Sequence, residues 1–314
     1  MEKQETYTFN SKDGHSQIHC RKWLPDGEPR AVVQLVHGMV EYIERYDEFA
    51  TFLSSKGYVV VGHDHIGHGH SVANADELGI MTGLHPSDDM VEDIYTHYSM
   101  TKKAYVSLPY FIIGHSMGSY LLRKFLSVKS AYIEDLNGAI ILGTGQEPAL
   151  KCNFGLAIIG LLSLIKGKNY KSATFRKMTF DKAYSIYDCD GKDYGKSWIS
   201  KNPRNVERYF NDPLCAYIFS LNAYKGLIET AKYVATKECL DTMRKGIPLL
   251  ILSGDADPVG NMGVGTKAAA DAFTKAGVKD VTFKLYQGDR HEILNELDRE
   301  LVYKDILEWL EAHK

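Results

Sequence analysis

The sequence predicts an α/β fold, a mostly parallel β-sheet with helices on both faces. Six short apolar runs have the length and composition of buried strands: AVVQLV (31–36), YVVVG (58–62), YFIIG (110–114), AIIL (139–142), PLLIL (248–252) and VTFKLY (281–286). Segments with apolar residues at helical spacing separate most of them. Strands that alternate with helices predict parallel pairs, and ligands bind at the carboxyl ends of such strands.

The elements before residue 110 follow this pattern in order. Two polar-patterned strands are expected near residues 5–10 and 16–24. The segment ERYDEFATFLSSKG (44–57) predicts a helix that ends at Gly57, with an apolar face of Tyr46, Phe49, Ala50 and Leu53. Ser87 is expected to cap the next helix, whose apolar face contains Met90, Val91, Ile94 and Tyr98.

One interval breaks the alternation. About a hundred residues separate the strand that ends at Leu142 from the one that begins near Ile247, whereas a crossover helix needs ~10–15. We therefore predict a core of residues 1–144 and 247–314 and an inserted, mainly helical cap segment of residues 145–246. The cap segment has 17 Lys and Arg against 10 Asp and Glu, so it carries +7 and the rest of the chain −10.

Composition excludes several classes of function. The net charge of −3 gives no uniform basic field, so nucleic acid is not expected as a partner. The first residues contain no apolar stretch typical of a signal peptide, so the default expectation is a cytoplasmic protein. Five scattered cysteines without a CxxC pair favour reduced thiols: Cys20, Cys152, Cys189, Cys215 and Cys239.

The pattern GHSMG (114–118) predicts a catalytic nucleophile. It matches GxSxG between a buried strand and an apolar-periodic helix, which is the context in which the pattern has physical meaning. Gly114 and Gly118 allow a sharp turn that exposes the hydroxyl of Ser116 at the end of the sheet. A structural turn is the alternative, and the flanking strand and helix disfavour it.

A serine hydroxyl needs a general base and an orienting carboxylate, which follow the nucleophile in the order acid, then histidine. Only two histidines come after residue 115, and His313 lies in the terminal helix or tail, so His291 in QGDRHEILNE is the expected base. The acid lies in SGDADPVG (253–260). Spacing does not choose between Asp255 and Asp257.

The oxyanion of an ester's tetrahedral intermediate requires hydrogen-bond donors. One expected donor is the backbone N–H of Met117, after the nucleophile. The other is the N–H of Met39 in HGMVE (37–41), where Gly38 lets the loop pass close to the substrate. An ordinary strand-to-helix turn is the alternative interpretation of this glycine.

The stretch GHDHIGHGHS (62–71) raises a competing function. His63, His65 and His68 approach the HxHxDH pattern of a class of zinc hydrolases, but Gly67 stands where that pattern has its aspartate. A metallohydrolase is therefore a weaker hypothesis. So is a non-catalytic binding protein, because such a protein has no chemical reason to keep Ser116, an acid and His291 together.

The chain resembles the monoacylglycerol lipase and lysophospholipase group of the α/β-hydrolase superfamily. The matching segments are HGMVEYIERY (37–46), HDHIGHGHS (63–71), GHSMG (114–118), GDADPVG (254–260) and RHEILNE (290–296). The resemblance implies that Asp257 is the acid and that residues 63–71 belong to the scaffold around a serine triad. It also makes Glu41 and Arg45 candidates for a polar pair at the alcohol end of the pocket. The alternative for this pair is a surface i,i+4 salt bridge.

The predicted function is a serine carboxylic-ester hydrolase that needs no metal or organic cofactor. The resemblance implies monoacylglycerol or lysophospholipid as the substrate, with short-chain or aryl esters as the alternative. The apolar run FGLAIIGLLSLI (154–165) is too short to span a hydrocarbon core of ~30 Å. Beside a cationic surface it predicts either peripheral contact with anionic lipid or a buried cap helix with solvated lysines.

Overall fold

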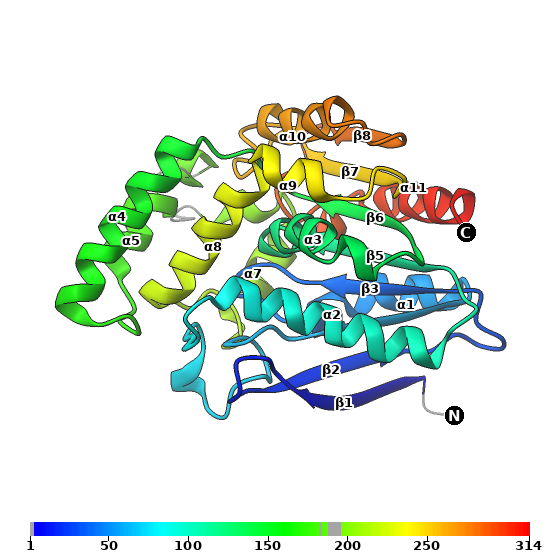
Figure 1. Cartoon of the computed structure of the whole chain (residues 1–314), viewed down its shortest axis with the longest axis horizontal. Coiled ribbons are helices and arrows are strands. Elements are labelled where there is room, and N and C mark those ends of the chain that lie inside the picture. The colour runs from blue at the N-terminus through cyan, green and yellow to red at the C-terminus, as the bar shows by residue number, and fades with distance from the viewer. Residues whose placement is uncertain (1–2, 182–183, 188–195) are drawn as a thin grey trace.

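An eight-stranded sheet in the order β1-β2-β4-β3-β5-β6-β7-β8 forms the centre of the protein (Figure 1). The computed structural model describes residues 3–181, 184–187 and 196–314. The strands are β1 Gln4–Asn10, β2 Gln17–Trp23, β3 Ala31–Val36, β4 Tyr58–His63, β5 Tyr110–His115, β6 Leu136–Leu142, β7 Leu249–Gly254 and β8 Val281–Tyr286.

The pairing confirms the predicted fold class. β1 pairs antiparallel with β2, and β2 pairs antiparallel with β4, whereas every pair from β4 to β8 is parallel. All six apolar runs form strands, and every residue of β3, β4, β5 and β7 is buried. The two polar-patterned strands form one edge of the sheet, where β1 is largely exposed.

Helices cover both faces of the sheet (Figure 1). On one face lie α2 (Pro86–Ala104), α3 (Met117–Val128) and α10 (Val264–Lys275), and on the other lie α1 (Asp47–Ser55) and α11 (Arg299–Ala312). Alternate residues of a strand enter different apolar clusters. In β3, Val32 packs with Ile94 of α2, whereas Val33 packs with Phe49 of α1. The residues of the two predicted helix faces are buried, but Tyr46 lies in the 3-10 turn η1 (Ile43–Tyr46), which precedes α1.

The start of α2 differs from the prediction. The helix begins at Pro86, with His85 as its N-cap, so Ser87 lies inside the first turn. A proline fits the first turn because its missing N–H would have no partner there. The hydroxyl of Ser87 instead accepts a hydrogen bond from Lys124 Nζ at 2.9 Å and joins α2 to α3.

The described part of the chain between β6 and β7 is mainly helical. Its helices are α4 (Ala149–Lys166), α5 (Ala173–Arg176), α7 (Pro203–Asn211), α8 (Leu221–Val234) and α9 (Lys237–Thr242), with short turns η4 (Lys177–Asp181), η5 (Ser185–Tyr187) and η6 (Ser197–Ile199). α8 packs against α4 and also against α2 and α3 of the core. The boundaries of the cap segment, 145 and 246, stay a prediction.

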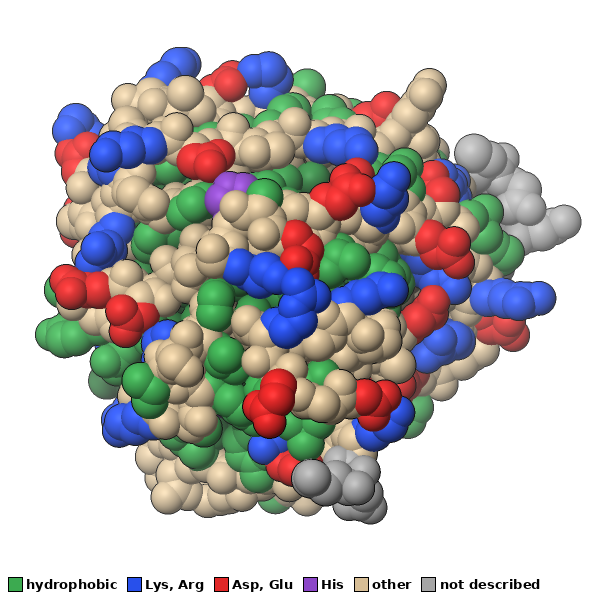
Figure 2. Space-filling model, turned by 90° about the vertical axis from the view of Figure 1, so that its right-hand side faces the viewer, with side chains coloured by type: hydrophobic (Ala, Val, Ile, Leu, Met, Phe, Trp, Pro, Cys, Tyr) green, Lys and Arg blue, Asp and Glu red, His purple; other side chains and the backbone are tan. Residues whose placement is uncertain are grey.

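The side of the molecule away from α4 faces the viewer in Figure 2. Basic and acidic side chains are interspersed across it, as a chain without a uniform basic field predicts. Four cysteines lie in the described residues, and all are buried free thiols: Cys20, Cys152, Cys215 and Cys239. Cys189 lies outside the described residues.

The loop after β4 is held by its own polar groups. Asp64 accepts the backbone N–H of Ile43 on one oxygen and that of His70 on the other, each at 2.7 Å. Gly67 has a φ of +71°, and a Cβ there would lie 2.5 Å from the carbonyl oxygen of Ile80. The backbone of this loop therefore requires glycine, as expected for a scaffold segment.

Five histidines near this loop are completely buried. Burial lowers the pKa of His37 and His63 to about 3 and that of His68 to about 4. It also lowers the pKa of His65 and His97. The unfolded chain binds protons on these side chains near pH 6.5, but the folded chain does not. Their contribution to stability is therefore complete above pH ~6.5 and is lost as the pH falls below it.

Acidification should destabilise the protein. Burial raises the pKa of Asp64 and Asp93 to about 7 and that of Asp289 to about 6, and proton uptake by these carboxylates in the folded state offsets part of the loss. Because the buried histidines outnumber these carboxylates, the unfolding free energy should still decrease by on the order of 2–4 kcal/mol per pH unit from pH ~6.5 toward 5. Urea denaturation at several pH values measures it. A denaturation midpoint that stays constant between about pH 7 and 5 would contradict this assignment.

Candidate active site

Ser116 occupies a strained turn between β5 and α3. Its backbone has φ 54° and ψ −120°, a conformation that L-residues avoid unless the surrounding structure enforces it. A Cβ at Gly118 would lie 2.1 Å from the carbonyl oxygen of Val36, and one at Gly114 would lie 2.5 Å from that of Gly118. Both glycines of GHSMG are therefore required by close backbone approach, as predicted.

Asp257 and His291 lie in contact on the loops after β7 and β8. His291 Nδ1 is 3.0 Å from Asp257 Oδ2, and both side chains are buried. Asp257 also accepts the N–H of Val259 at 2.9 Å and the hydroxyl of Ser253 at 3.2 Å. Burial alone would raise the pKa of Asp257, but His291 and these hydrogen bonds outweigh it and hold the pKa below its usual value.

The other candidate acid has a different partner. Asp255 accepts the N–H of Gly288 at 2.7 Å and thereby joins the loops after β7 and β8. The geometry therefore pairs Asp257, and not Asp255, with His291.

The loop 37–41 passes directly beside Ser116. A Cβ at Gly38 would lie 3.1 Å from Cβ of Ser116, so only glycine fits this approach without displacing a neighbour. Met39 lines the cavities that contain Ser116. Met117 is the first residue of α3, whose N-terminal N–H groups have no partner within the helix. The structure thus places Met39 and Met117, which the sequence predicts as oxyanion donors, beside Ser116.

The pair of Glu41 and Arg45 is buried, so the surface alternative is wrong. Arg45 Nη1 lies 2.8 Å from Glu41 Oε2, and both side chains are less than a tenth exposed. The guanidinium also binds Glu292 through two hydrogen bonds of 2.7 and 2.8 Å and stacks over Tyr209 at 4.7 Å. Glu41 lines the cavity that contains Ser116, whereas Arg45 lies behind it between the two carboxylates.

Glu41 also connects the loop 37–41 to Tyr46 and to His115, the residue before Ser116. Its Oε1 accepts the N–H of Gly38 at 2.6 Å and the hydroxyl of Tyr46 at 2.9 Å, and it lies 3.2 Å from Nδ1 of His115. The other ring nitrogen of His115 lies 3.2 Å from the carbonyl oxygen of His291. Burial disfavours a charge on His115, but the Glu41 carboxylate outweighs it and raises the pKa of His115.

Two cavities meet at Met39 and Ser116. The larger, of about 280 Å³, contains His291, Glu41 and Glu292 and an aromatic wall of Trp198, Tyr209, Phe210, Tyr217 and Tyr224. The smaller, of about 160 Å³, lies against α4 and α8, and its wall combines aliphatic side chains of α8 and Val259 with Tyr120, Trp198, Glu147 and Lys151. Both cavities thus contain apolar and polar groups; aliphatic side chains of α8 line the smaller one, and the carboxylates of Glu41 and Glu292 line the larger one.

Sequence reasoning missed several residues of this site. Glu292 follows His291 directly, so a second acidic residue beside the predicted base was the available signal. Asn205 donates to Glu292 at 2.7 Å, and the ring of Trp198 stacks on His291 with a centroid distance of 5.2 Å. Both come from the cap segment, where no pattern marks them.

The histidines of the zinc-hydrolase hypothesis do not converge. Among the described residues, His63, His65 and His68 belong to no group of three potential metal ligands within reach of one ion. Their rings pack against one another, and each has one buried ring nitrogen without a hydrogen-bond partner there. They occupy the interior of the scaffold, not the walls of the two cavities.

Replacing Arg45 should destabilise the fold strongly. In Arg45→Met, two buried carboxylates lose their cation, which typically costs about 3–5 kcal/mol of unfolding free energy. Thermal or urea denaturation measures the change. The matched control is Lys304→Met, which removes an exposed i,i+4 pair with Glu308 and should change stability by less than ~1 kcal/mol. If both substitutions lowered the unfolding free energy equally, the buried pair would contribute no more to stability than a surface pair.

Comparisons with known proteins identify the family of the chain. The family model described as "Serine aminopeptidase, S33" (Hydrolase_4) matches residues 27–298. The human protein named monoglyceride lipase is 29% identical over 93% of this chain and 86% of its own length. Phospholipase YtpA of Bacillus subtilis is 25% identical over 90% of this chain and 95% of its own.

Solved structures show the same architecture. The crystal structure of a thermostable carboxyl esterase from Bacillus coagulans superposes with a TM-score of 0.91 at 26% identity and covers 100% of this chain and 99% of its own. The family model spans most of the sequence, including the segments that contain Ser116, Asp257 and His291. The chain therefore belongs to this serine aminopeptidase S33 family of α/β hydrolases.

Proposed function

We propose that the protein hydrolyses carboxylic esters of single-chain lipids, monoacylglycerols or lysophospholipids, by acyl transfer to Ser116. The observation that carries the proposal is the meeting of Ser116, on its strained turn, with His291 in one cavity, while Asp257 binds the far nitrogen of His291. Family membership supports a hydrolase of the lipase or esterase type.

The reaction follows from the roles of these groups. His291 removes the proton of Ser116, and the hydroxyl oxygen attacks the ester carbonyl carbon. The backbone N–H groups of Met39 and Met117 stabilise the oxyanion. His291 then gives its proton to the leaving alcohol. A water molecule, activated by His291, attacks the acyl-enzyme and releases the carboxylic acid, while Asp257 orients His291 and stabilises its charged form.

The two cavities support separate binding of the acyl chain and the alcohol group of the substrate. The cavity against α4 and α8, with the aliphatic side chains of Leu227, Ile228 and Val259 in its wall, matches an acyl chain, and the cavity with Glu41 and Glu292 matches a polar alcohol group. Relatives named monoglyceride lipase and phospholipase support the two lipid classes. The aromatic wall of the larger cavity favours a second candidate, the hydrolysis of aryl or short-chain esters, in which an aromatic alcohol stacks on Trp198.

A surface role of α4 supports a lipid substrate. The apolar run 154–165 is part of the longer helix α4 of 18 residues, so the run alone underestimated the length of the apolar segment. By length and composition, α4 is the one helix in the described residues that could cross a membrane; its mean hydropathy is 1.6, and 11% of its residues are buried. Its exposed apolar side chains are Leu150, Phe154, Leu161, Leu164 and Ile165. Lys166 and Lys168 at its C-terminal end are exposed. We propose that α4 lies on anionic lipid surfaces and brings substrate to the cavities.

Ser116→Ala should abolish hydrolysis, because no other group in the proposed mechanism attacks the ester. We expect kcat/KM for p-nitrophenyl butyrate to fall at least ~10³-fold. The control Ser55→Ala removes an exposed hydroxyl on α1 and should leave activity unchanged. Wild-type turnover in Ser116→Ala would refute the mechanism.

The same assay, extended to lipids, tests the substrate class. The wild type should hydrolyse a monoacylglycerol or a lysophosphatidylcholine with a higher kcat/KM than p-nitrophenyl butyrate, and Ser116→Ala should lose both activities. The reverse preference would favour the aryl or short-chain esterase.

Binding of α4 to lipid should depend on its exposed apolar residues. The double variant Leu164→Asp/Ile165→Asp should no longer sediment with vesicles of anionic phospholipid, because it places two charges on the face that enters the lipid. Val106→Asp, at an exposed apolar site outside the cap segment, is the matched control and should still bind. Failure of the wild type to sediment at low salt would contradict the proposal.

A further inference from the structure

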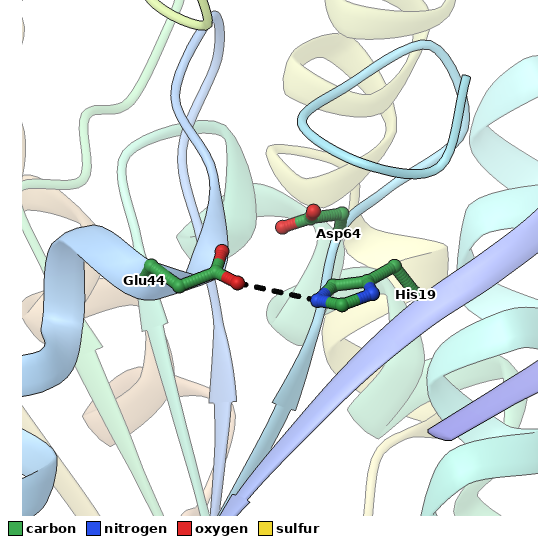
Figure 3. A group of neighbouring side chains, drawn as sticks. All are labelled: His19, Glu44 and Asp64. Carbon is green, nitrogen blue, oxygen red and sulfur yellow. Dashed lines mark hydrogen bonds and ion pairs between the residues drawn. The ribbon is translucent and has the colours of Figure 1, made fainter. Parts of the chain in front are cut away.

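A group of potential metal ligands lies outside the proposed reaction site. His19 on β2, Glu44 on η1 (Ile43–Tyr46) and Asp64 after β4 present ligand atoms that all lie within 4.8 Å of one another. Figure 3 shows the His19 ring and the two carboxylates turned toward a common region. None of the three residues lines the cavities that contain Ser116.

The carboxylate of Glu44 is incompletely satisfied. Its Oε1 lies 3.2 Å from Nε2 of His19. Its Oε2 is buried and has no hydrogen-bond partner among the described residues. Buried carboxylate oxygens normally have a partner, so an oxygen of this kind has a free coordination position.

His70 adds a second imidazole to the group. Its Nε2 lies 4.0 Å from Oε1 of Glu44, and its ring packs edgewise against His19 at a centroid distance of 5.0 Å. The side chain of His70 is half exposed, so its ring can rotate toward the group. The oxygens of Asp64 hold the backbone N–H groups of Ile43 and His70, and each keeps a second lone pair for a metal.

One cation already lies nearby. Arg21 Nη1 is 3.3 Å from Oε1 of Glu44. The guanidinium has two further acceptors, since Nη2 donates to Gln4 and lies 3.5 Å from Asp47 Oδ1. If a metal ion binds Glu44, Arg21 therefore still has Gln4 and Asp47 as partners. Its guanidinium competes with the ion for the carboxylate of Glu44.

We propose that His19, His70, Glu44 and Asp64 form a binding site for a divalent transition-metal ion, with Zn²⁺ as the best match. Two imidazole nitrogens and two carboxylate oxygens are a ligand set that Zn²⁺ takes in tetrahedral geometry, with ligand atoms roughly 3.3–3.5 Å apart. His19 and Glu44 already have nearly this spacing, at 3.2 Å. Mg²⁺ and Ca²⁺ prefer sites made of oxygen ligands alone.

The bound ion would fasten three segments together. It joins β2, η1 and the loop after β4, and η1 directly follows the loop 37–41 beside Ser116. The ion takes no part in ester hydrolysis, so its effects are on stability and independent of the proposed function.

Zn²⁺ titration of the untagged full chain, treated first with a chelator, tests the site by calorimetry. We expect one saturable site with a Kd on the order of 10 µM or tighter and an increase in Tm at saturating Zn²⁺. His70→Gln should weaken Kd about tenfold or more, since it removes a ligand without removing a buried contact. His15→Gln, at an exposed histidine in the turn between β1 and β2, should bind as the wild type does. Arg21→Gln should tighten Kd because it removes the competing cation.

Two further variants make the outcome decisive. Glu44→Gln should also weaken Zn²⁺ binding, and its Tm without metal shows whether this variant is folded. If it is unfolded, the Zn²⁺-induced Tm shift of His70→Gln tests the site in its place. His291→Gln should bind Zn²⁺ normally. The proposal is overturned if the wild type shows no saturable binding below about 100 µM. It is also overturned if His70→Gln binds as tightly as the wild type, or if His291→Gln alone loses the ion.

Discussion

The buried guanidinium of Arg45 is the interaction on which the geometry of the site depends. It lies between the carboxylates of Glu41 and Glu292, and each carboxylate belongs to a different loop at the carboxyl end of the sheet. A buried charge without a partner is far more costly than a paired one, so neither loop can move away alone. Through Glu41 the same network holds the N–H of Gly38, and Asn205 connects it to the cap segment.

The residues that face the larger cavity differ from those that hold them in place. Glu41 and Glu292 face the larger cavity, but Arg45 is occupied by them and by the ring of Tyr209. In the proposed reaction its part is therefore positional. His115 has a similar part, because it joins Glu41 to the backbone of His291 from a position next to Ser116. The strained turn at Ser116 is thus surrounded by groups that cannot relax independently.

The histidine-rich loop after β4 has two environments. His63, His65 and His68 point into the interior and stay neutral because burial disfavours their charged form. His70 lies at the surface beside His19 and Glu44, where an imidazole can meet an ion. Residues 63–69 are buried, and His70, which follows them, is exposed beside His19 and Glu44.

The sequence by itself determined the fold class and the order of the chemical groups. Buried parallel strands need near-continuous apolar runs, and a nucleophile on a sharp turn needs GHSMG, so both leave local patterns. Asp257 was chosen over Asp255 by resemblance alone, and the position of His85 as the N-cap of α2 was missed because the proline directly before Ser87 begins the helix. Glu292, Asn205 and Trp198 became visible only in the tertiary structure. Their roles arise from contacts between segments far apart in the chain, and residues that meet only after folding carry no periodic signal in the sequence.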